Sequence, residues 1–140
     1  MTRPSLSLGL AAAALLIASC GGSSDDEKAV KKAVKGVYDA LADKDAKRVC
    51  DSISKAGKER LSRSTPPRGG KRQSCEQVFR VGLAFAGDAL KAARDAEVTD
   101  VTVHGGQAKA TVRVERRKSD VGLVKQHGEW KLSGLDLTGG

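Results

Sequence analysis

The chain has 140 residues, which suits one small domain and is too short for two ordinary ones. Its formal net charge is +8, and aromatic residues make up only 3% of it. A basic chain can bind nucleic acid, but so few aromatic side chains leave few platforms on which bases could stack, so the composition argues against a nucleic-acid partner.

An apolar segment opens the chain. Residues 6–18 are almost wholly apolar or small, and Arg3 is the only charged residue before Cys20. The run is shorter than the about 20 apolar residues needed to cross a bilayer, and it fits the core of a secretory signal peptide. The stretch of Ile17, Ala18, Ser19 and Cys20 that follows resembles the lipobox of bacterial lipoproteins, in which the cysteine receives a diacylglycerol. The alternative is an ordinary signal peptide with a chance cysteine.

The lipobox resemblance implies a processed chain. Residues 1–19 would be the cleaved signal peptide, acylated Cys20 would become the first mature residue, and residues 20–26 would form a flexible tether rich in Gly and Ser. The expected location is extracytoplasmic, with membrane lipid as a partner through Cys20. The excess of Lys and Arg over Asp and Glu would then attract anionic lipid headgroups or acidic wall polymers, or would simply keep the domain soluble.

Three helices are predicted between residues 26 and 96. In residues 26–42, apolar side chains recur every three to four positions, which is the pattern of one buried helical stripe. A shorter helix is expected over residues 46–54, and a third over residues 74–96, with Phe79 and Phe85 on its buried face. Residues 62–73 hold two prolines, two glycines and four cations, and they predict a surface loop.

Cys50 and Cys75 form an even pair once Cys20 is assigned to lipid. In an oxidising compartment such a pair predicts a disulfide, and closing this loop should contribute roughly 3.5 kcal/mol to stability. A zinc site is disfavoured because the chain has no CxxC and neither histidine lies near a cysteine in sequence. A reactive thiol is disfavoured because no base is evident beside either cysteine.

After residue 96 the apolar residues alternate with polar ones. The alternation predicts strands over residues 98–104, 107–115, 121–126 and 129–135, with glycine turns after His104 and His127. A sheet with one buried and one solvent-exposed face is typically antiparallel. Trp130 and Leu132 should both lie on the face that packs on the helices. Helices followed by such strands predict an α+β fold.

Three stretches carry a family resemblance: VYDALADKDAKRVCD, VTVHGGQAKATVRV and VKQHGEWKLSGL. Together they resemble the NTF2-like (SnoaL-like) superfamily in its small bacterial lipoprotein form, over a domain spanning residues 27–138. The resemblance implies N-terminal helices packed on a curved antiparallel sheet, a cone that often encloses an apolar pocket. The superfamily contains isomerases, dehydratases and non-catalytic binding modules, so the fold alone does not identify the function.

No nucleophile-elbow, zincin, P-loop or Rossmann motif occurs in the sequence, and no metal or cofactor is expected. Tyr38, Phe85 and Trp130 are the candidate pocket-lining residues. The prediction is a membrane-anchored, non-catalytic binding or scaffolding module of the cell envelope, whose partner is an envelope protein or a small apolar ligand. The alternative is a small isomerase, dehydratase or hydrolase with its pocket near Tyr38.

Overall fold

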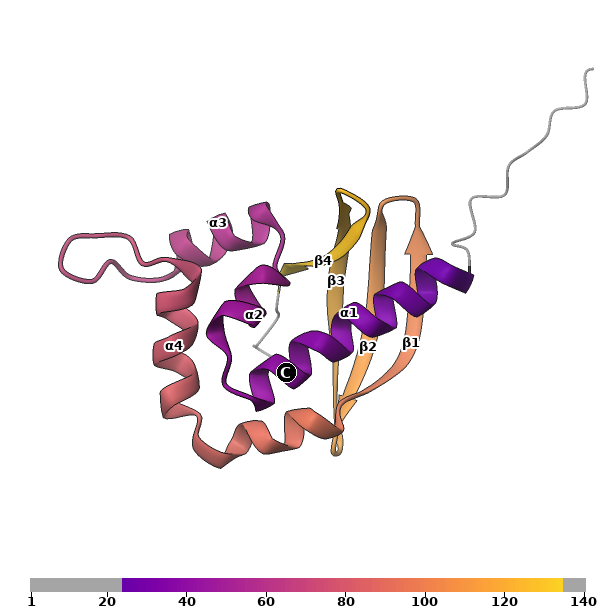
Figure 1. Ribbon diagram of the computed structural model, residues 1–140, viewed down its shortest axis with the longest axis horizontal. Helices are drawn as coiled ribbons and strands as arrows, with labels where there is room; N and C mark the ends of the chain where they lie inside the picture. The colour runs from indigo at the N-terminus through magenta and orange to yellow at the C-terminus, as the bar shows by residue number, and fades with distance from the viewer. Residues whose placement is uncertain (1–23, 135–140) are drawn as a thin grey trace, which may run out of the picture.

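The computed structural model describes residues 24–134, in which helices come first and strands follow (Figure 1). The predicted signal peptide, Cys20, most of the tether and the expected strand end at Leu135 lie outside these residues. None of the helices among residues 24–134 is long and apolar enough to cross a membrane. The elements are α1 (Ser24–Ala42), α2 (Ala46–Asp51), α3 (Lys55–Ser64), α4 (Cys75–Phe85), the 3-10 helix η1 (Gly87–Asp95), β1 (Glu97–His104), β2 (Gln107–Val114), β3 (Arg117–Gln126) and β4 (Glu129–Gly134).

The four strands form an open antiparallel sheet in the order β1-β2-β3-β4, which confirms the predicted α+β class. Side chains alternate across the sheet, as a pleated strand requires. The outer face carries ion pairs between Lys109 and Asp120, at 2.7 Å, and between Arg113 and Glu97. The inner face is apolar and consists of Val101, Val103, Ala108, Ala110, Val112, Val121, Leu123, Trp130 and Leu132.

Helix α1 lies across the inner face of the sheet (Figure 1). Its Val30, Val34 and Val37 are fully buried against the strands, so the predicted apolar stripe is confirmed. At the start of α1, Asp26 Oδ1 accepts hydrogen bonds from Trp130 Nε1 (3.3 Å) and Lys125 Nζ (2.8 Å). These contacts join the first turn of α1 to the closing hairpin, and Trp130 and Leu132 both face the helices as expected.

Helices α2, α3 and α4 form the other end of the domain. The backbone of Ser54 donates to the Leu132 carbonyl, and the backbone of Leu132 donates to the Ser52 carbonyl, each at 2.8 Å. This short parallel bridge holds the α2–α3 junction against the edge of β4. The disulfide between Cys50 and Cys75, predicted from the sequence, is present, with the two Cα atoms 5.9 Å apart.

Two helical predictions are wrong. Helix α3 occupies residues expected to lie beyond the second helix, which itself ends at Asp51 rather than at residue 54. The expected third helix is broken, because Gly87 adopts a φ of +56°, a conformation that glycine accepts without steric cost, and a 3-10 helix follows in a new direction. Phe85 is 85% exposed instead of buried, because it lies roughly 200° around α4 from the buried Leu83.

Candidate functional site

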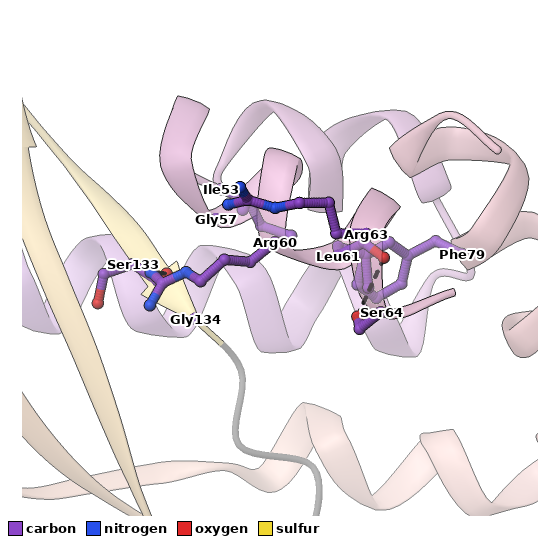
Figure 2. Close-up of a pocket in the computed structure, with 9 residues that line it drawn as sticks. All are labelled: Ile53, Gly57, Arg60, Leu61, Arg63, Ser64, Phe79, Ser133 and Gly134. Atoms are coloured by element: carbon purple, nitrogen blue, oxygen red, sulfur yellow. Dashed lines mark hydrogen bonds between the residues drawn. The ribbon is translucent and has the colours of Figure 1, made fainter. Parts of the chain in front are cut away.

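A groove opens where α3, α4 and the end of β4 meet (Figure 2). Its volume is about 680 Å³, which is within the range of small-molecule sites. The residues that line it come from three segments that are distant in sequence: Ile53, Gly57, Arg60, Leu61, Arg63, Ser64, Phe79, Ser133 and Gly134.

The floor of the groove is apolar. Ile53 is 6% exposed, because the bridge to Leu132 draws its backbone against β4. Phe79 is 8% exposed and comes from the inner stripe of α4, while Leu61 of α3 is half-buried between them. Binding to such a floor is favourable, because it removes the apolar surface of a ligand from water.

Two arginines stand over this floor. Arg60 and Arg63 are both exposed, and Arg60 Nη2 donates to the carbonyl oxygen of Ser133, so its side chain reaches from α3 to the end of β4 (Figure 2). Within residues 24–134, no carboxylate forms an ion pair with either guanidinium. A guanidinium stays protonated and presents a planar fork of donors, which matches a carboxylate, sulfonate or phosphate.

The close approach of α3 to β4 sets the shape of the groove. Ser54 begins α3, and its side-chain oxygen accepts a hydrogen bond from the Gly57 N–H at 3.1 Å, which is an N-cap. Gly57 is buried at the contact: a Cβ there would lie 2.7 Å from Ile53 Cγ2 and 3.0 Å from the Ser133 carbonyl oxygen. A larger residue would therefore push α3 away from β4.

None of the three residues proposed from sequence as pocket lining lines this groove. Tyr38 is half-buried on α1, packed against the core. Trp130 is 6% exposed, beneath Asp26 and with Lys125 Nζ 5.5 Å from its ring centroid. Phe85 is exposed at the end of α4. The groove residues that sequence reasoning missed, above all Arg60 and Arg63, belong to α3, whose polar sequence gave no helical stripe.

The titratable groups with displaced pKa values lie on the surface, away from the groove. Hydrogen bonds from Arg94 and then Arg48 lower the pKa of Asp43, and a hydrogen bond from Lys109 lowers that of Asp120. His104 ends β1 and His127 lies in the β3–β4 turn; both are exposed, and the glycine turn predicted after each is present. Residues 24–134 contain no cluster of three or more side chains suited to a metal ion.

A scan against protein-family models found no match to this chain, and a search of the curated proteins found none either. The chemistry of the groove is therefore the guide to function. It joins an apolar floor to fixed positive charge and has no imidazole or carboxylate among its lining residues. Such an arrangement can hold an amphipathic anion.

Proposed function

We propose that this protein is a membrane-anchored extracytoplasmic lipoprotein whose NTF2-like domain is a non-catalytic binding module. Its ligand has an apolar body and an anionic group. The observation that carries the proposal is the apolar floor of Ile53, Leu61 and Phe79 beside two arginines that have no carboxylate partner among the described residues.

The membrane anchor is supported by the lipobox-like residues that end at Cys20. Helix α1 starts at Ser24, so at most about 14 Å of extended chain would separate the acylated cysteine from the folded domain. Stable attachment takes two or more acyl chains, which a lipoprotein cysteine provides. The domain would therefore stay close to the membrane surface at the start of α1.

The NTF2-like assignment is supported by the element order and by α1 lying across an antiparallel sheet that ends in a hairpin with Trp130. In this chain the side chains of α1 fill the inner face of the sheet, since Val34, Val112 and Leu132 are all fully buried. We infer that the cone is packed shut and that the ligand site has its place at the helical end instead.

The binding role can be tested with an anionic apolar dye, 8-anilino-1-naphthalenesulfonate, and its uncharged relative N-phenyl-1-naphthylamine. The folded chain should bind the sulfonate saturably. The variant Arg60→Gln/Arg63→Gln should bind it about tenfold more weakly, because charge-assisted hydrogen bonds are lost, while its affinity for the uncharged dye should change little.

The matched control is Arg116→Gln/Arg117→Gln, which removes the same charge from two exposed residues, one in the β2–β3 turn and one at the start of β3. Trp130, the only tryptophan of the chain, reports whether each variant is folded. Equal sulfonate affinities in the two double variants would show that the groove arginines do not hold the anion, and the proposed function would be wrong.

A further inference from the structure

Positive charge is concentrated in one segment that the groove uses only in part. Residues 60–75 contain five cations and no acid, against a net charge of +8 for the whole chain. Arg68, Lys71 and Arg72 lie beyond the groove and line a second hollow of about 360 Å³. Its other lining residues are Gln73, Gln77, Arg80 and Val81.

These cations are carried by a structured turn, which we call the basic hairpin (residues 66–73). Arg68 and Lys71 exchange two backbone hydrogen bonds of 3.1 Å, and Gly69 and Gly70 between them both have positive φ, as a type I′ turn requires. Gln73 Nε2 donates to the Pro66 carbonyl at 3.0 Å, and the disulfide fixes Cys75 just beyond the hairpin. The charges are therefore held in place on a short scaffold.

A stripe of side chains that ends in apolar Val81 and Phe85 continues from the hollow along α4. Gln77, Val81 and Phe85 are spaced by four residues, so they lie on one face of the helix. The first two line the basic hollow, and Phe85 follows them with 85% of its surface exposed. The basic hairpin and this stripe together form what we call the hairpin–α4 face. Its cations are unpaired within residues 24–134, apart from a 3.9 Å contact between Arg80 and Glu76.

The hairpin–α4 face lies far from the start of α1. Figure 1 shows the basic hairpin, between α3 and α4, projecting at one end of the longest axis, while the start of α1 lies toward the other end. A domain attached only through its first helix would be free to swing about that point. A second attachment at the hairpin end would lay the long axis along the surface.

We propose that the hairpin–α4 face binds the surface of an anionic lipid bilayer, with the cations of the basic hairpin on lipid phosphates and Phe85 inserted at the headgroup boundary. A surface that pairs basic residues with an exposed aromatic side chain is suited to this interface. A soluble polyanion would satisfy the cations but would leave Phe85 in water. The biological setting rests on the proposed membrane location, but the binding itself does not need the acyl anchor.

The test uses the chain from residue 20 onward carrying Cys20→Ser, which keeps the entire described core and lacks the lipid. It should sediment with vesicles of phosphatidylglycerol and phosphatidylcholine in equal parts, and not with phosphatidylcholine alone. Added salt should weaken the binding, because exposed charges are screened. The variant Arg68→Gln/Lys71→Gln/Arg72→Gln should partition about 100-fold more weakly.

Three controls separate this face from general charge and from the groove. Arg116→Gln/Arg117→Gln/Lys118→Gln removes the same charge from exposed residues of the β2–β3 turn and the start of β3, and it should have a far smaller effect. Phe85→Ser should weaken binding about tenfold at constant charge, and Phe85→Trp should restore it. Arg60→Gln/Arg63→Gln should still bind vesicles, so failure of the groove proposal would leave this result standing.

Either of two results would overturn the inference. Equal loss in the two triple variants would mean that net charge alone draws the chain to the vesicles. Tight binding to inorganic polyphosphate, with no binding to the anionic vesicles, would assign the face to a soluble polyanion instead of a bilayer.

Discussion

Gly57 occupies the first turn of α3, where a Cβ would lie 2.7 Å from Ile53 Cγ2 and 3.0 Å from the Ser133 carbonyl oxygen. Alanine favours a helix over glycine by about 1 kcal/mol, but here the added methyl must displace β4 backbone. We expect Gly57→Ala to lower the free energy of unfolding by about 1–3 kcal/mol. Denaturant unfolding followed by Trp130 fluorescence measures the change.

Gly82 provides the matched control for this substitution. It lies inside α4, and no atom comes within 4 Å of the position that the alanine methyl group would occupy. Gly82→Ala should raise the free energy of unfolding by about 0.5–1 kcal/mol. If the two alanine variants changed stability alike, the close packing of α3 on β4 would not be what requires glycine at position 57.

At the scale of elements, the disulfide ties α2 to the first residue of α4, 25 positions further along the chain. Removing this link raises the conformational entropy of the unfolded chain, so it should lower the free energy of unfolding by roughly 3.5 kcal/mol. The variant Cys50→Ala/Cys75→Ala should match the reduced wild type in chemical unfolding. It should also be insensitive to reductant, and a reductant effect of the same size in this variant would contradict the assignment.

The elements predicted well from sequence are those with a single buried face. Val30, Val34 and Val37 mark α1, and the alternation of β2 marks a strand, because burial on one side imposes a period that can be counted. Helix α3 buries only Gly57, so its sequence has no apolar stripe to count. The third helix is predicted too long because the pattern continues past Gly87, whose positive φ turns the chain.

The candidate site is harder to predict than the fold. Cys50 and Cys75 can be paired from composition and compartment, and the structure joins them. The groove cannot be found in this way, since Ile53, Phe79 and Ser133 meet only through tertiary packing. Arg60 and Arg63 resemble ordinary surface cations until the helix that carries them is placed over an apolar floor.

At the scale of the whole molecule, surface ion pairs make the stability depend on pH. Hydrogen bonds from lysines lower the pKa of Asp51, Asp120 and Glu129, and Arg94 does so for Asp43. A carboxyl with a lowered folded pKa stabilises the fold above its unfolded pKa, and the contribution is lost as the pH falls through the folded value.

The melting temperature should therefore fall as the pH drops below the ordinary aspartate value of 3.8. The fall should be shallower in high salt, because these exposed pairs are screened. Thermal unfolding across an acid series at two salt concentrations measures both effects. A melting temperature that rose on acidification would contradict the role of these pairs.

The order of the elements also decides when the chain can begin to fold. Side chains of α1 are buried against strands that follow the helices in the sequence. Asp26 accepts a hydrogen bond from Trp130, which lies 104 positions further along the chain. The four strands pair only with their sequence neighbours, so the sheet can assemble quickly once its strands have been made. Helix α1 can contact α2 and η1 earlier, but it cannot complete the burial of its apolar stripe before the strands are present. A chain emerging from the ribosome would thus remain without a complete core until β4 has been made.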